Sequence, residues 1–265
     1  MEQAPYTAKA AIWRLDPALK GVCWLPLAGG RTNRLWRIGG FTVKKYQADA
    51  ASPLFPNDAA AEARALELFA PLGIAPRLRA AGADWLVYDH AEGAVWSGDP
   101  APVARALHVL HGARVGGGVF RSAPNGSAAV LAHARAIHAL PDAPDDPGLG
   151  PVAAMPIHAD AVSGNVLATP QGPLLIDWQC PALGDPAEDL CTFVSPAMTW
   201  LYSGRVLSAA EVEGFLASYP DPAVVARARA MMPVYRHRIA AHCAWKAARG
   251  DADYEDALRI ELQSR

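Results

Sequence analysis

Short runs of alternating apolar and polar residues fill the first ninety positions and are separated by glycine and proline. Residues 22–27, 35–38 and 41–46 carry the alternation typical of strands, with turns expected at residues 28–30 and 39–40. A further apolar run at residues 85–88 indicates a last strand, reached through a connecting loop at residues 76–83. The pattern therefore predicts an antiparallel sheet at the start of the chain.

One helix interrupts these strands. Apolar residues recur at helical spacing over residues 59–70, and either Asn57 or Asp58 can cap the first turn. The expected buried face consists of Ala63, Leu66 and Phe69. Glu62 falls in the first turns of this helix.

From residue 100 onward the periodicity becomes helical. Ser127 is expected to cap a helix that follows a turn-rich loop, and Ser208 with Glu211 forms a capping box for another. Pro233 must end or kink the long helix that its surroundings predict. The helices expected in this part include residues 127–140, 222–249 and 253–262. The chain is thus predicted to be α+β, with a mixed part over residues 1–90 and a mainly helical part over residues 91–265.

Composition narrows the function classes. The 265 residues are 52% hydrophobic, enough for a sizeable core, and the net charge of −2 gives no basic surface for nucleic acid. The cysteines form no Cys-x-x-Cys pair, which argues against a zinc site and favours a reducing cytoplasm. No secretory leader or stretch of about 20 uninterrupted apolar residues is present in the sequence. We expect a cytoplasmic protein without a membrane partner, either a monomer or a homodimer.

Candidate chemistry concentrates between residues 156 and 189. Asp160 and Asn165 have the separation found in the catalytic loop of protein kinases, where the aspartate accepts a hydroxyl proton and the asparagine holds a metal. Asp177 follows a short apolar strand, so its carboxylate should project from a strand end. Carboxylate and amide oxygens suit Mg2+. These residues predict a phosphoryl-transfer centre.

The segments HADAVSGNVL and LLIDWQCPALGDPAEDL resemble the signature of the aminoglycoside phosphotransferase and choline kinase superfamily. That signature usually has glycine where this chain has Ala159, and a larger apolar residue where it has Ala161. The resemblance implies a two-lobed, protein-kinase-like fold that uses ATP and Mg2+. It makes Asp160 the catalytic base and Asn165 and Asp177 the metal ligands. The residues expected to brace this loop are His158, Asp185 and Asp189.

The same resemblance extends to the predicted sheet. LAGGRTNRLWRI is similar to the glycine-containing nucleotide loop of these kinases, which makes Asn33 a nucleotide-binding candidate. Lys44 would reach the phosphates, with Lys45 as the alternative if the strand register differs, because neighbouring strand side chains face opposite ways. Glu62 would pair with this lysine. The resemblance further implies that the backbone of Asp89 and His90 meets the adenine edge.

The acceptor is less well defined by the sequence. Aromatic faces beside carboxylates can bind a quaternary ammonium or thiazolium group, which favours choline, ethanolamine or thiamine. The residues considered for this pocket are Trp178, Asp185, Glu188, Trp200, Tyr202, Glu211, Tyr235 and Trp245. The alternatives are an aminoglycoside, another sugar or an amino alcohol as acceptor. A non-catalytic nucleotide-binding module and a metal hydrolase that uses His158, Asp160 and Asp177 also stay open.

Overall fold

A computed structural model describes residues 5–27 and 32–264 of the chain. The turn expected at residues 28–30 therefore lies outside the described residues. Among the helices of the described part, none is long and apolar enough to cross a membrane.

An antiparallel sheet opens the molecule, as the alternating pattern predicts. Its strands run in the order β1-β2-β3-β5-β4. Their bounds are β1 Leu25–Leu27, β2 Arg34–Ile38, β3 Phe41–Lys45, β4 Leu78–Ala81 and β5 Trp85–Asp89. Strand β4 corrects the expected connecting loop, because this edge strand is half-exposed and too short to give a clear sequence signal.

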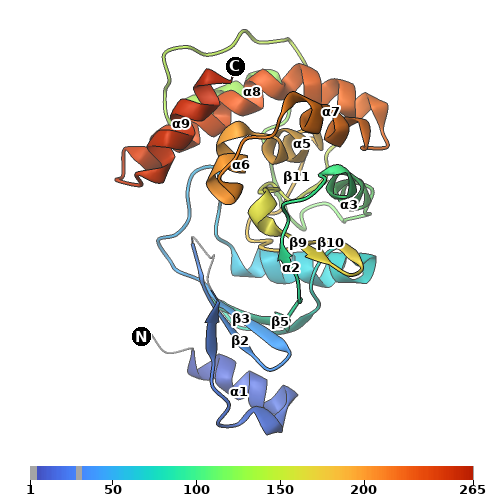
Figure 1. Cartoon of the computed structure of the whole chain (residues 1–265), viewed down its shortest axis with the longest axis vertical. Coiled ribbons are helices and arrows are strands. Elements are labelled where there is room, and N and C mark those ends of the chain that lie inside the picture. Colours follow the sequence, from blue (N-terminus) through green and yellow to red (C-terminus); the bar gives the residue numbers. More distant parts are fainter. Residues whose placement is uncertain (1–4, 28–31, 265) are drawn as a thin grey trace.

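Two helices cover opposite faces of this sheet (Figure 1). Helix α2, Ala59–Phe69, lies between the sheet and the rest of the molecule, and the side chain of Asp58, not Asn57, caps it. Helix α1, Tyr6–Leu15, packs on the outer face, although the sequence analysis expected a single helix here. It escaped notice because it has no side-chain cap and its buried face is mostly alanine.

The remainder is mainly helical, with two small sheets below the helices (Figure 1). The helices are α3 Ala101–His111, α4 Ser127–Ile137, α5 Ala187–Phe193, α6 Pro196–Ser203, α7 Ala209–Ala217, α8 Pro222–Ala247 and α9 Asp253–Gln263. The small sheets have the orders β10-β9-β6 and β7-β11-β8. Their strands are β6 Ala94–Val95, β7 Arg121–Ser122, β8 Met155–Ile157, β9 Val166–Thr169, β10 Gly172–Leu175 and β11 Ala182–Gly184. Single 3-10 turns occur at Pro17–Leu19, Ala70–Leu72 and Ser163–Asn165.

Helix ends test the sequence reasoning further. Ser208 and Glu211 form the predicted capping box at the start of α7. Ser127 does not cap α4, because its hydroxyl bonds Asp146 in the following extended segment and Gly126 holds the cap position. Pro233 does not end α8, which continues through it. Local sequence patterns therefore predicted most of the helices. Contacts with distant residues determined where some of these helices begin or end.

The main hydrophobic core runs through both parts of the molecule. Phe69 of α2 and Leu86 of β5 belong to the same buried cluster as Leu110 of α3 and Trp178. A second cluster fixes α1 to the outer face of the sheet through Ile12. Because one core joins α2 to the helical part, the sheet is held against the loops between β8 and β11. The division of the chain at residue 90 stays a prediction.

Candidate functional site

The loop between β8 and β9 brings Asp160 and Asn165 together. The Nδ2 atom of Asn165 donates hydrogen bonds to the carbonyl oxygen of Asp160 at 2.9 Å and to its Oδ2 at 3.0 Å. A 3-10 turn at Ser163–Asn165 closes the loop, and both Asp160 and Asn165 are only 6% exposed. The five-residue separation of Asp160 and Asn165 therefore allows the Asn165 amide to bond the Asp160 carboxylate.

Asp189 holds the start of this loop from α5. Its Oδ1 accepts the N–H of Ala159 at 2.8 Å, and its Oδ2 accepts the N–H of His158 at 2.8 Å. The ring of His111 contacts the same Oδ2 at 3.0 Å. Burial alone would raise the pKa of Asp189, but the hydrogen bond and charge of His111 and the contacts of His158 lower it below the ordinary value. Asp189 therefore has the bracing position expected for it.

Ala159 has a left-handed backbone, with φ of 62°. This conformation favours glycine, the residue usual at this position in the signature that the sequence resembles. The hydrogen bond from Ala159 to Asp189 holds the strained residue in place. The signature shows that alanine replaces the usual glycine at position 159. Only the positive φ shows that this replacement strains the backbone.

Asp177 reaches the same loop from the end of β10. The N–H of Ile176 donates to the carbonyl oxygen of Asn165 at 2.9 Å, and His158 Nε2 contacts the carbonyl oxygen of Ile176 at 3.0 Å. Asp177 itself has a φ of 61°, which turns the chain sharply after the strand. These contacts place Asp177 and Asn165 in the walls of the same cavities.

Lys44 links the sheet to this loop. Its Nζ lies 2.5 Å from Glu62 Oε2 and also forms an ion pair with Asp177. Burial would lower the pKa of Lys44, but Asp177 and Glu62 outweigh burial and raise it above the ordinary lysine value. Lys45 faces away and pairs with Asp84 near the surface. The strand register therefore selects Lys44, and Lys44 and Glu62 meet as predicted.

Tyr46 is a residue that the sequence analysis did not assign to the site. Its hydroxyl donates to Glu62 Oε2, the same oxygen that Lys44 contacts. Burial raises the pKa of Glu62, whereas Lys44 and the Tyr46 hydroxyl lower it. Tyr46 therefore helps to keep a buried carboxylate ionised and directed at the lysine. Its position two residues after Lys44, on the same strand face, is the signal that could have identified it.

The donors around Asp160 suit a hard divalent cation. Burial raises the pKa of Asp160 well above its ordinary value, and the carboxylate of Asp177 raises it further. A cation between these groups would relieve this repulsion, and the oxygens of Asp177 and Asn165 are ligands of the type that Mg2+ takes. Within the described residues, no group of three His, Cys, Asp or Glu side chains could hold a metal. A Mg2+ ion here would be held by the carboxylate of Asp177 and the amide oxygen of Asn165.

A cavity of about 740 Å3, the sheet-side cleft, separates the sheet from β9 and α6. Thr42 and Lys44 of β3 line one wall, and Asn165 and Asp177 line another. Such a volume is typical of sites that bind a cofactor-sized ligand. Tyr88 lies in the wall beside Lys44.

Asn33 lies in the wall of the sheet-side cleft, but its amide is already engaged. Nδ2 donates to Asn57 Oδ1 at 2.7 Å and to Gln179 Oε1 at 2.8 Å. Gln179 also accepts a hydrogen bond from Thr32 at 3.3 Å, so it joins the first sheet residues to the segment after Asp177. No local sequence pattern predicts this hydrogen bond, because Asn33 and Gln179 are far apart along the chain.

The two predicted adenine-edge residues differ in placement. His90 lines the sheet-side cleft, and its Nδ1 lies 2.8 Å from the hydroxyl of Thr42. Asp89 pairs with Arg79, and its N–H donates to Arg77 within the sheet. This placement does not support a ligand contact by Asp89, because its polar groups hold β4 against β5.

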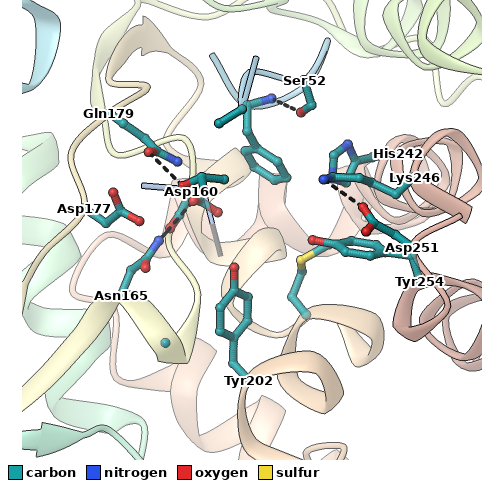
Figure 2. Close-up of a pocket in the computed structure, with 15 residues that line it drawn as sticks. Ser52, Asp160, Asn165, Asp177, Gln179, Tyr202, His242, Lys246, Asp251 and Tyr254 are labelled. Carbon is teal, nitrogen blue, oxygen red and sulfur yellow. Dashed lines mark hydrogen bonds and ion pairs between the residues drawn. The ribbon is translucent and has the colours of Figure 1, made fainter. Parts of the chain in front are cut away.

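A second cavity, of about 160 Å3, lies beyond Asp160 on the side of α8 and α9 (Figure 2). We call it the helix-side pocket. Figure 2 shows Asp160, Asn165 and Asp177 on one side of it and His242, Lys246, Asp251 and Tyr254 on the other, with Tyr202 between them. Its remaining wall includes Ser52 and Phe55, which precede α2.

The helix-side pocket corrects the predicted aromatic cage. Of the residues considered for that cage, Tyr202 alone is among the described residues that line the pocket. Trp178 and Tyr235 are buried in the main core, and Glu188 is paired with Arg238 at 2.8 Å. The pocket residues His242 and Lys246 on α8, and Asp251 before α9, were not predicted. No local sequence pattern distinguishes them from residues on an ordinary helix surface.

Comparisons with known proteins agree with this geometry. A model of the phosphotransferase enzyme family matches residues 24–228. A probable ketoamine kinase of Thermus thermophilus is 34% identical over 240 residues, which cover 80% of this chain and 84% of that protein. The crystal structure of a choline/ethanolamine kinase family protein from Mesorhizobium loti superposes with a TM-score of 0.69 at 18% identity, covering 97% of this chain and 92% of that one. The structure of APH(2″)-IIa in complex with gentamicin has a TM-score of 0.63 at 13% identity, covering 100% and 98% of the two chains.

Proposed function

Since the chain belongs to the phosphotransferase enzyme family and is therefore a kinase, we propose that it moves the γ-phosphate of ATP to a hydroxyl group of a small, amine-bearing polyol. The observation that carries this proposal is the convergence of Asp160, Asn165 and Asp177 beneath Lys44. Asn165 and Asp177 line both cavities, Asp160 lines the helix-side pocket, and Lys44 lines the sheet-side cleft.

The sheet-side cleft is the proposed nucleotide site. Lys44, oriented by Glu62, would bind the phosphates, and Asn33 and His90 lie in the walls that would surround the rest of the nucleotide. In this proposal residues 1–90 form the nucleotide-binding lobe and residues 91–265 the catalytic and acceptor-binding lobe. Asn165 and Asp177 would hold Mg2+, which when bound neutralises phosphate charge.

Asp160 is the proposed general base. Its buried carboxylate faces the helix-side pocket, so an acceptor hydroxyl there would be within reach for proton transfer. The raised pKa of Asp160 brings its basicity closer to the working pH, which improves a general base provided that it stays ionised. The nearby Lys44 favours the ionised form. Asn165 fixes the orientation of the carboxylate through its hydrogen bond.

The acceptor is proposed to be a ketoamine, which is a ketose chain that carries an amine. The Thermus thermophilus relative is named a probable ketoamine kinase, and the identity to it extends over most of the chain. The helix-side pocket supports a hydroxyl-rich acceptor, because Thr32, Ser52 and Gln179 line it. The aromatic cage predicted for a choline-like cation does not form there, because Tyr202 alone of its proposed members is among the described residues that line the pocket.

The test is ADP release with Mg2+-ATP and a panel of a ketoamine, choline, ethanolamine, thiamine, homoserine and an aminoglycoside. We expect turnover with the ketoamine, and a fall in kcat of about 10²- to 10⁴-fold in Asp160→Asn with nearly unchanged ATP binding. Asp84→Asn, which removes a carboxylate at the surface, is the matched control.

Each contrary outcome has a distinct meaning. Turnover with choline and not with the ketoamine would restore the cationic-alcohol hypothesis. ATP binding without phosphorylation of any acceptor would favour the non-catalytic module. Hydrolysis of a substrate without ATP would favour the metal hydrolase.

A further inference from the structure

An ion pair lies in the wall of the helix-side pocket opposite the proposed base. Lys246 Nζ is 2.9 Å from Asp251 Oδ2. Lys246 belongs to the last turn of α8, and Asp251 lies in the turn between α8 and α9. Figure 2 shows the pair across the pocket from Asp160.

The pair is more accessible to water than Asp160. The side chains of Lys246 and Asp251 are 25% and 49% exposed, whereas Asp160 is 6% exposed. Ion pairs that water reaches contribute only about 0 to 1 kcal/mol to stability. A ligand can therefore separate Lys246 from Asp251 at small cost, provided that it offers an opposite charge to each.

A buried histidine, His242, lines the pocket together with the pair. His242 is nearly fully buried, and burial together with the charge of Lys246 lowers its pKa to about 3. The imidazole is therefore neutral at physiological pH, and its Nδ1 has no hydrogen-bond partner in the part of the chain that the structure describes. Lys246 also lies 5.5 Å from the ring centroid of Tyr254. Among the described residues that line the pocket, Lys246 is the one lysine or arginine.

We propose that Lys246 and Asp251 form a subsite for a zwitterionic group on the acceptor. A carboxylate of the acceptor binds Lys246 and an ammonium group binds Asp251, while the hydroxyl-bearing carbons extend toward Asp160. The acceptor class is thus a ketoamine whose amine is that of an amino acid. This inference rests on the proposed function, since it deepens the substrate class of the same site.

Two opposite charges are needed because a ligand with one charge leaves half of the pair without a partner. A lone ammonium would displace Lys246 from Asp251 and be repelled by it, and a lone carboxylate would do the converse with Asp251. A zwitterion exchanges one ion pair for two, and each new contact is a charge-assisted hydrogen bond. The subsite therefore selects against simple amines and simple acids.

The first experiment measures binding without the reaction. L-norleucine carries both charges, n-pentylamine carries the ammonium alone, and hexanoate carries the carboxylate alone. NMR titration of the wild-type protein is expected to give a Kd for norleucine about tenfold lower than for either analogue, because norleucine forms one more charge-assisted hydrogen bond than either of them. Equal affinities for the three compounds would overturn the proposal, and this comparison requires no variant.

Variants of the pair test whether Lys246 and Asp251 cause the preference for norleucine. Lys246→Met and Asp251→Asn should each remove the advantage of norleucine. Arg259→Met is the matched control, because it breaks the exposed pair with Asp256 on α9 outside the pocket. Thermal unfolding of each variant shows whether it is folded. If folded Lys246→Met and Asp251→Asn keep the tenfold preference, the subsite lies elsewhere and the proposal is wrong.

The second experiment connects the subsite to catalysis. One ketose is attached to the side-chain amine of lysine, of Nα-acetyllysine and of lysine amide, so that the free head carries both charges, the carboxylate alone or the ammonium alone. We expect kcat/KM to be about tenfold higher for the lysine adduct, mainly through KM, and this preference to vanish in Lys246→Met. Equal kcat/KM for the three adducts would refute the subsite but leave the ketoamine kinase intact. Phosphorylation of none of them would contradict the proposed function, and the norleucine titration would then decide the subsite by itself.

Discussion

The two cavities that share Asn165 and Asp177 in their walls are built in different ways. On the side of the sheet-side cleft, Lys44, Glu62, Asp177 and Tyr46 are bonded to one another and mostly buried. On the side of the helix-side pocket, the polar side chains come from segments without a shared motif, and the pair Lys246 and Asp251 is partly hydrated. In the proposed function, the groups for phosphoryl transfer therefore belong to a bonded network, while the acceptor would be chosen by residues that can change without unfolding the protein.

Asp189→Asn tests the rigid side most strongly. An amide would replace a carboxylate that accepts the N–H groups of His158 and Ala159 and contacts His111, so at least one donor would lose its partner. We expect the free energy of unfolding at neutral pH to fall by about 3 kcal/mol and kcat to fall with it. Chemical denaturation and steady-state kinetics provide the measurements.

The pH dependence of this loss has a definite sign. Because the folded-state pKa of Asp189 is lowered, its stabilisation is present above the ordinary aspartate pKa and is lost as the pH falls through the folded-state value. The stability difference between wild type and variant should therefore shrink in acid. Asp185→Asn is the control, since Asp185 pairs with Arg227 and its loss should lower stability with a smaller effect on kcat. Equal kcat losses in both variants would show that Asp189 has no special connection to the catalytic loop.

Gly164→Ala tests the boundary between the two cavities. Gly164 lines both of them, and a Cβ atom there would lie 2.1 Å from Cδ1 of Tyr202, which also lines both. Because the ring must move, we expect a stability loss of about 2 kcal/mol and a higher KM for ATP and for the acceptor. Gly214→Ala in α7 has open space around the new atom, and it should be neutral or stabilising by up to about 1 kcal/mol. An unchanged KM for both substrates would mean that Tyr202 does not shape either site.

Ala159→Gly should have the smallest effect. Glycine relieves the left-handed strain of Ala159 by about 1 to 2 kcal/mol but loses a buried methyl group worth about 0.8 kcal/mol and adds chain flexibility. We expect a net change within about 0.5 kcal/mol in denaturant unfolding. Ala161→Gly, at a buried position without a left-handed backbone, should lose about 1 to 2 kcal/mol. Equal losses in the two variants would mean that the backbone at Ala159 carries no strain.

The sequence was sufficient where neighbouring residues act together. Asp160 and Asn165 are five residues apart, so their spacing identified them as members of one catalytic loop, and the structure adds that the amide of Asn165 bonds the carboxylate of Asp160. The resemblance limited the proposed phosphate-binding lysine to Lys44 or Lys45, alternation implied that only one of them faces the cleft, and the structure places Lys44 there. The same alternation missed Tyr46, although it lies on the same strand face as Lys44.

Tertiary structure decided the features that depend on distant segments. Asp89 has the sequence position of a linker residue, and only the structure shows that its side chain pairs with Arg79, while the expected contact of its backbone with adenine stays a prediction. The predicted aromatic cage failed because tryptophan and tyrosine residues serve the core as readily as a pocket and only packing distinguishes the two uses.

By itself the sequence determined the α+β class, the family and the residues around the proposed phosphate site, because this chemistry requires fixed residue types at short, fixed spacing. The helix-side pocket, where we propose that the acceptor binds, was decided by the fold alone. Its walls combine the segment before α2, the helix α6 and the end of α8, and no short-range pattern records which faces of these elements meet. Binding of an acceptor depends on surfaces assembled by packing, and packing is a property of the whole chain.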